Sequence, residues 1–74
     1  MTPLVIHNNL RSLRQAQGLA QYGLAALARV SPTTIQAAEK WGHLPSRPVR
    51  QRLATALGVR PMDIWPDLEP EVTE

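Results

Sequence analysis

The segment from Gln21 to Lys40 constrains the fold most, because it predicts two short helices joined by a tight bend. Two helices that cross steeply over a turn of three or four residues leave little room where they meet. Ala25 supplies the small side chain that such a crossing requires. Ser31 followed by Pro32 is a helix start signal, since the hydroxyl can cap the helix and the proline ring already holds a helical φ. The other residues expected to face inward are Leu24, Ala28, Val30, Ile35 and Ala38.

The rest of the chain predicts an all-α fold, a small bundle of four to five short helices. Alanine and leucine dominate, both of which favour helix, and no alternation with period two persists beyond the first few residues. Caps, glycines and prolines place the helix ends. In chain order, the residues expected to bound or limit the helices are Asn8 or Asn9, Gln17, Gln21, Ala28, Pro32, Lys40, Ser46, Gly58, Pro61 and Pro66.

The length of 74 residues allows one small domain, which we place at residues 1–66. A chain of this size buries only about 60% of its unfolded surface. Residues 1–7 form an apolar lead, expected to be a strand-like arm or a flap over the core. Residues 67–74 are acidic and poor in apolar side chains, so a disordered tail is predicted there. Cysteine is absent and the histidines His7 and His43 lie far apart, so no metal site is expected.

Charge divides the chain into two parts. Residues 1–62 hold all eight lysines and arginines against a single acid, Glu39, whereas residues 63–74 hold five acids. A basic body suits a polyanionic partner, although ordinary solvated charge is the alternative. No apolar run approaches the length of a membrane span and no signal peptide opens the chain, so a cytoplasmic protein is expected.

The order and spacing of these elements resemble the phage-repressor and Cro-like (XRE-type) family of helix-turn-helix regulators. The resemblance covers roughly residues 8–65. It is carried by the Gln21–Lys40 segment together with residues 9–14, 18–21, Glu39, 45–46 and 53–59. It implies a lambda-repressor-like DNA-binding domain that acts on double-stranded DNA as a small transcriptional regulator of the repressor type. It implies no cofactor, and it implies a homodimer at least on DNA, because operators in the family are usually two-fold.

In such a fold the helix over residues 32–40 enters the major groove, and its outward stripe faces base edges. The resemblance places Pro32, Thr33 and Ala37 nearest the bases, with Gln36 alongside. Thr33 can hydrogen-bond a base edge, and Gln36 can pair in bidentate fashion with adenine. The alternative interpretation is that Thr33 and Gln36 are plain solvent-exposed helix residues.

A second set of polar residues is predicted to contact phosphates. Gln21 opens its helix where the family grips the DNA backbone. Arg47 and Arg50 lie in the first turn of the following helix, where the dipole favours anions. A phosphate bound by the free amides near Ser46 would resolve that conflict, and otherwise the two arginines are merely solvated. The full predicted set is Gln21, Ser31, Lys40, Ser46, Arg47 and Arg50.

Two further features follow from the comparison with the family. Residues at the positions of Arg14 and Glu39 commonly pair there, so a structural ion pair is predicted between them. Arg29 stands where the family usually has glycine, so either it adopts a left-handed conformation or the turn takes another shape. Glycine also comes one residue later than usual after Glu39, at Gly42, so the helix exit is expected to be reshaped.

The tryptophans are expected to have structural roles. Trp41 is predicted to pack at the exit of its helix. Met62, Ile64, Trp65 and Leu68 form an apolar set. We expect this set either to cover the bundle or to contact a second copy of the chain. This set and the acidic tail leave open an alternative function, a protein-interaction module such as an antitoxin or a coactivator-like partner. No nucleophile–base set, paired carboxylates or phosphate-cradling glycine loop is present, so an enzyme is not expected.

Overall fold

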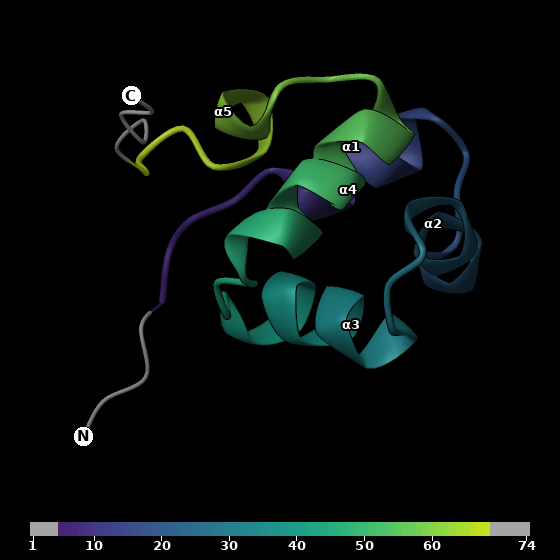
Figure 1. Cartoon of the computed structure of the whole chain (residues 1–74), viewed down its shortest axis with the longest axis horizontal. Coiled ribbons are helices and arrows are strands. Elements are labelled where there is room, and N and C mark those ends of the chain that lie inside the picture. The colour runs from purple at the N-terminus through teal and green to yellow at the C-terminus, as the bar shows by residue number, and fades with distance from the viewer. Residues whose placement is uncertain (1–4, 69–74) are drawn as a thin grey trace.

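The computed structural model describes residues 5–68, and over that range the chain folds into five α-helices (Figure 1). The expectation of an all-α bundle is confirmed. The helices are α1 Leu10–Ala16, α2 Gln21–Ala28, α3 Pro32–Trp41, α4 Arg47–Leu57 and α5 Pro61–Ile64. The predicted disordered tail falls almost wholly outside the described residues, as do the first four residues of the predicted arm. None of the helices in the described part is both long and apolar enough to cross a bilayer.

The helices surround one core, and α2, α3 and α4 each pack against two other helices. Helix α4 packs against α2 and α5, while α3 packs against α1 and α2. In Figure 1, α3 lies along the lower edge, with α2 on the right and α5 at the upper left. The Gln17 side chain also donates a hydrogen bond of 2.7 Å to the Leu57 carbonyl, which ties the end of α1 to the end of α4. The helix pair α2–α3 therefore sits on one side of the bundle, with α3 at its edge.

The core is built from aliphatic side chains, several alanines and one tryptophan. Full burial of a large apolar side chain contributes about 1.5–3 kcal/mol, so these residues supply most of the stabilisation. The alanines let the helix backbones approach closely at the crossings. The buried apolar residues are Leu10, Leu24, Ala25, Ala28, Ile35, Ala38, Leu53, Ala54, Leu57, Ile64 and Trp65. The inward positions predicted on both sides of the bend are therefore confirmed, with Val30 half-buried against this core.

The predicted apolar set around Trp65 is divided between core and surface. Ile64 is 0% and Trp65 1% exposed, so neither side chain is available to a second copy. The dimer-patch hypothesis is wrong for these two residues, and the alternative that they cover the bundle holds. The reason is that the short α5 packs against α4 and turns both side chains inward. Met62 is 51% exposed and Leu68 is half-buried.

Residues 5–9 strap α3 to α5. Val5 forms an isolated antiparallel bridge with His43, and the Ile6 amide donates to the Gly42 carbonyl at 3.0 Å. The Asn8 side chain donates to the Ala38 carbonyl at 3.0 Å, while the Asn9 amide donates to the Ile64 carbonyl at 2.8 Å. The strap therefore crosses the bundle as an extended arm.

Asparagine also caps the first helix, as expected. Asn9 is the N-cap residue by backbone position, but its side chain makes no cap bond and donates instead to the Asp63 carbonyl. The capping oxygen is Oδ1 of Asn8, which accepts from the Leu10 amide at 3.0 Å. At the other end, Gly18 has a φ of +70° and ends the helix as predicted. Both asparagines thus serve the helix start and the long-range strap together.

Candidate nucleic-acid interface

The turn between α2 and α3 is closed by a left-handed arginine. Arg29 has φ 58° and ψ 46°, and within residues 5–68 it is the only non-glycine residue with a positive φ. A side chain at such a position costs on the order of 1 kcal/mol relative to glycine. Of the two alternatives left by the sequence, the left-handed conformation is the one adopted. The Val30 amide then donates to the Ala25 carbonyl at 3.0 Å, which completes the end of α2.

The start of α3 is capped in the way its sequence predicts. The Ser31 hydroxyl accepts a hydrogen bond of 3.2 Å from the Thr33 amide, and Pro32 occupies the first helical position. No acidic side chain lies in the first turn. The positive end of the helix dipole is therefore left to solvent or to an external anion.

The outward face of α3 is polar and accessible. Thr33 and Gln36 are exposed, whereas Pro32 and Ala37 are half-buried. Ile35 and Ala38, on the opposite side, are buried in the core. A helix of ten residues that exposes one stripe at the edge of the molecule has the dimensions that the major groove of B-DNA admits.

A buried carboxylate holds α3 to α1 and α2. Glu39, whose side chain is 0% exposed, accepts from Nε of Arg14 at 2.7 Å and from Nη2 of the same arginine at 3.0 Å. The pair predicted from the family resemblance is therefore present in the structure. Nε2 of Gln21 also donates to Oε1 of Glu39 at 3.1 Å, and Nε of Arg11 lies 3.5 Å from the same oxygen. One carboxylate thus gathers three side chains from two other helices.

Glu39 remains ionised at neutral pH. Burial by itself raises the pKa of this carboxyl, but the hydrogen bonds from Arg14 and Gln21, together with the Arg14 charge, outweigh burial and lower the pKa below its usual value. The Glu39 hydrogen bond likewise raises the pKa of Arg14, so both partners stay charged. Arg14 also donates to the Leu19 carbonyl at 2.6 Å through Nη1. The start of α2 is therefore held by two contacts, from Arg14 to the Leu19 carbonyl and from the Gln21 side chain to Glu39.

The first turn of α4 is basic. Ser46 and Arg47 are exposed, and no acidic residue lies in this turn. The Ser46 side chain makes no cap bond, so its hydroxyl does not cover the helix amides. Nη1 of Arg50 donates to the Pro45 carbonyl at 2.6 Å, which ties its guanidinium to the preceding loop. This bond uses one of the guanidinium donors of Arg50 and fixes where the side chain lies.

The C-terminal end of α3 is reshaped as expected, but Trp41 does not lie where the sequence predicted. The helix runs one residue further than expected, through Trp41, and Gly42 ends it with a φ of +68°. Trp41 is 66% exposed, so the prediction that it packs at the exit is wrong. Its ring instead lies under Nζ of Lys40, 5.0 Å from the ring centroid. A cation held over an exposed ring is weakly attracted to it and stays at the end of the helix.

Known proteins resemble this chain in sequence and in fold. Residues 8–63 match the sequence model of the family described as a helix-turn-helix domain. The protein belongs to this family. This helix-turn-helix protein is a DNA-binding transcriptional regulator of the Cro/repressor type, as its resemblance implied, and not an enzyme.

A solved structure of the same fold gives a closer comparison. The crystal structure of the restriction-modification controller protein C.AhdI from Aeromonas hydrophila superposes with a TM-score of 0.69 and 34% sequence identity. The match covers 74% of this chain and 83% of that one. No curated protein matches the chain in sequence.

Two contacts to Glu39 beside the candidate interface of this helix-turn-helix protein were not predicted from the sequence. Arg11 lies beside Glu39, and its spacing of three residues from Arg14 on one helix face is the signal that could have shown it. The sequence gives no such signal for the hydrogen bond from Gln21 to Glu39, because a glutamine at a helix start can equally be hydrated. Glu39 takes up one N–H of the Gln21 side-chain amide, so the second N–H of that nitrogen and the backbone amides of the first turn of α2 are the donors that remain for a ligand.

Proposed function

We propose that the protein binds operator sequences in double-stranded DNA as a repressor-type regulator in the cytoplasm, with α3 in the major groove. The observation that carries this proposal is the accessible stripe of Thr33 and Gln36 on a helix whose opposite face is locked by the core and by Glu39. Such a helix is held rigidly at one tilt, and rigid placement is what base reading requires.

Direct reading of bases falls to four positions. Gln36 is exposed and can make a bidentate contact with adenine, which is worth about 1–3 kcal/mol of discrimination. Thr33 can donate to or accept from a base edge, and its methyl group can contact thymine. Pro32 and Ala37 are half-buried and apolar, so they supply shape and methyl contacts alone. With one bidentate side chain per copy, high specificity requires two copies on one operator.

Phosphate contacts come from the helix starts and from the basic residues beside them. The first turns of α3 and α4 carry no acid, and at α4 no side chain caps the helix amides, so these can face an anion. Arg47 stands beside the amides of α4, and Lys40 stands at the far end of α3. The residues proposed to contact phosphates are Gln21, Ser31, Lys40, Ser46, Arg47 and Arg50.

A homodimer on DNA is part of the proposal. Two copies related by a two-fold axis would place their α3 helices in successive major grooves about one helical turn apart. With Ile64 and Trp65 in the core, the α4–α5 surface can offer Met62 to the second copy. C.AhdI is described as a restriction-modification controller protein, and the similarity of this chain to it extends the proposal to control of such a system.

Selection of bound duplexes from a random pool tests the reader helix. The expected result is a two-fold consensus whose half-sites lie about one turn apart. Gln36→Ala and Thr33→Ala should each change the preferred bases at specific positions. Gln15→Ala is the matched control, because Gln15 is an exposed glutamine on α1. An unchanged consensus after both α3 substitutions would remove α3 as the reader.

A salt titration tests the phosphate contacts separately. Arg47→Ala should weaken binding to all duplexes alike and reduce the slope of log affinity against log salt by about one unit. Arg60→Ala, an exposed arginine beyond α4, should leave the slope unchanged. Absence of duplex binding even at low salt would instead favour a protein-interaction module on the same fold.

A further inference from the structure

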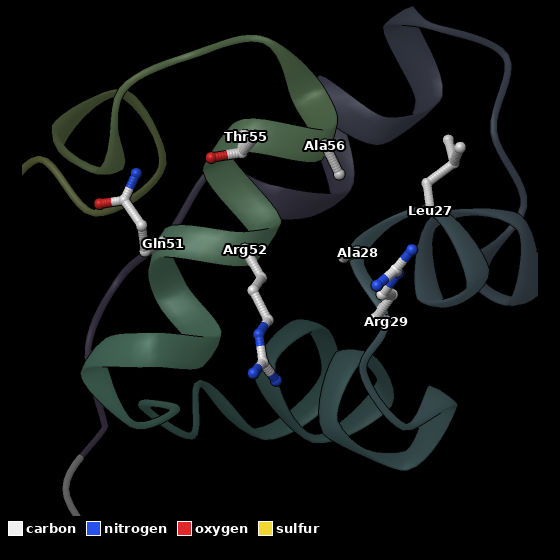
Figure 2. A pocket seen from close by; sticks show the side chains of 7 residues that line it. All are labelled: Leu27, Ala28, Arg29, Gln51, Arg52, Thr55 and Ala56. Carbon is white, nitrogen blue, oxygen red and sulfur yellow. The ribbon is translucent and has the colours of Figure 1, made fainter.

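A shallow pocket lies between the end of α2 and the middle of α4, away from the outward face of α3. Its volume is about 250 Å³. Figure 2 shows Arg29 and Arg52 extending from opposite walls of this pocket, with Leu27 on α2 above Arg29. The lining residues are Leu27, Ala28, Arg29, Gln51, Arg52, Thr55 and Ala56. None of them belongs to the residues proposed to contact DNA.

The lining combines apolar surface with unbalanced positive charge. Leu27 is 60% exposed although it is a large aliphatic side chain, and Ala56 lies across the pocket from it on α4. Arg29 and Arg52 are exposed, and neither guanidinium has an ion-pair or hydrogen-bond partner within residues 5–68. No acidic residue lines the pocket. A ligand that complements this surface must therefore be both aliphatic and anionic.

The backbone at Arg29 adds an independent observation. Its left-handed conformation is strained for any residue with a Cβ, and glycine would occupy the same turn without strain. Backbone strain that persists in a folded protein is typical of positions where the side chain has a use. The use visible in the structure is the placement of a guanidinium beside the exposed Leu27.

We propose that this pocket docks an acidic segment of a partner protein, which inserts one aliphatic side chain against Leu27 and Ala56 and pairs carboxylates with Arg29 and Arg52. Small-molecule sites are typically larger, at about 300–1,000 Å³, and enclose most of their ligand, so a single side chain fits this hollow better. A DNA backbone would satisfy the arginines but has no aliphatic group to cover Leu27. Because the docking residues and the DNA-contacting residues are separate, the protein can hold both partners at once.

A short synthetic helical peptide that presents one leucine between two glutamates is the probe. Its addition to the isotope-labelled full chain should shift amide resonances of residues 27–29 and 51–56 and leave those of residues 32–37 in place. A counterpart peptide with lysines in place of the glutamates should produce no shifts. Shifts spread evenly over the basic surface, or equal shifts with the lysine peptide, would overturn the proposal.

Variants then separate docking from general attraction. Arg52→Ala and Arg29→Gly should each weaken peptide binding about two- to fivefold, the factor expected for one exposed charge pair. Arg29→Gly relieves the strained turn, so weaker binding by this variant does not reflect poor folding. Lys40→Ala removes a cation outside the pocket and should leave peptide binding unchanged. Equal weakening by Lys40→Ala would contradict the proposal.

Duplex binding by the same variants distinguishes this proposal from the function proposed above. Arg52→Ala and Arg29→Gly should retain the affinity of the unmodified chain for duplex DNA. If they instead lose duplex affinity and the peptide shifts nothing, the arginines belong to the phosphate contacts, and the docking proposal fails while the DNA proposal stands.

Discussion

Arg14 on α1 and Glu39 on α3 form a two-point ion pair, with 2.7 Å from Nε to Oε2 and 3.0 Å from Nη2 to Oε1. The parallel geometry matches the fork of the guanidinium to both carboxylate oxygens. The pair is 10% exposed on the arginine side and 0% on the glutamate side. The helix that we propose to read DNA is therefore positioned by an interaction shielded from water.

Loss of one partner of this pair should destabilise the protein more than loss of both. Arg14→Met leaves the Glu39 carboxylate buried without its main counter-ion, which should lower the free energy of unfolding by about 3–5 kcal/mol. The double variant Arg14→Met, Glu39→Met removes the stranded charge and should recover part of that loss. Urea denaturation of the single and double variants measures both. A double variant as unstable as the sum of its singles would show that the two side chains act independently.

Acid should destabilise the fold through Glu39. The pKa of this carboxyl is lower in the folded protein than its ordinary value of 4.5, so the unfolded chain binds the proton more readily. The stability contributed by Glu39 is therefore fully present above pH 4.5 and is lost as the pH falls through the lower, folded-state pKa. Thermal denaturation from neutral to acidic pH should show this loss. In Glu39→Gln the acid-dependent part of the stability should shrink, and an unchanged pH profile would exclude Glu39 as its source.

Arg29→Gly should stabilise the protein. Glycine adopts a φ near +58° without steric penalty, so the free energy of unfolding should rise by on the order of 1 kcal/mol. Arg29→Ala is the matched control, since alanine keeps the Cβ and should give little or no gain. Chemical denaturation of the two variants provides the measurement. Equal stabilities for the glycine and alanine variants would place the effect in the side chain instead of the backbone.

Gly42→Ala should destabilise the protein more than Gly58→Ala. Both glycines end helices with nearly the same positive φ, +68° and +70°. A Cβ on Gly42 would lie 2.7 Å from Cγ1 of Val5, whereas a Cβ on Gly58 meets nothing within 4 Å. The second variant thus reports the backbone penalty alone, of about 1 kcal/mol, and the first adds the clash. Stability curves in denaturant give both values.

A second substitution locates the cause of that difference. Adding Val5→Ala to Gly42→Ala should remove most of the excess destabilisation, because it deletes the methyl group that a new Cβ would meet. If the double variant were no more stable than Gly42→Ala, the strap over residues 5–9 would not be the source of the clash.

Much of the site followed from short-range patterns in the sequence. Ser31 and Pro32 mark the start of α3, and the exposed positions of Thr33 and Gln36 follow from the helical period once Ile35 is placed inside. The Arg14–Glu39 pair came from the family resemblance, because two charges on separate helices carry no local signal of their contact. The pocket between Arg29 and Arg52 had no sequence signal for the same reason.

What the sequence by itself determined is where each helix begins and ends, to within one residue for α1 to α4, and which face of α2 and α3 turns inward. Caps, left-handed glycines and apolar spacing act within one or two helical turns, so their effect can be read from neighbouring residues. Only the tertiary structure decided that Trp65 is buried while Trp41 lies on the surface, and that Arg50 is held by the Pro45 carbonyl. A tryptophan carries the same apolar area in either place, and the packing of α5 against α4, distant from any local signal, selects which one the core encloses.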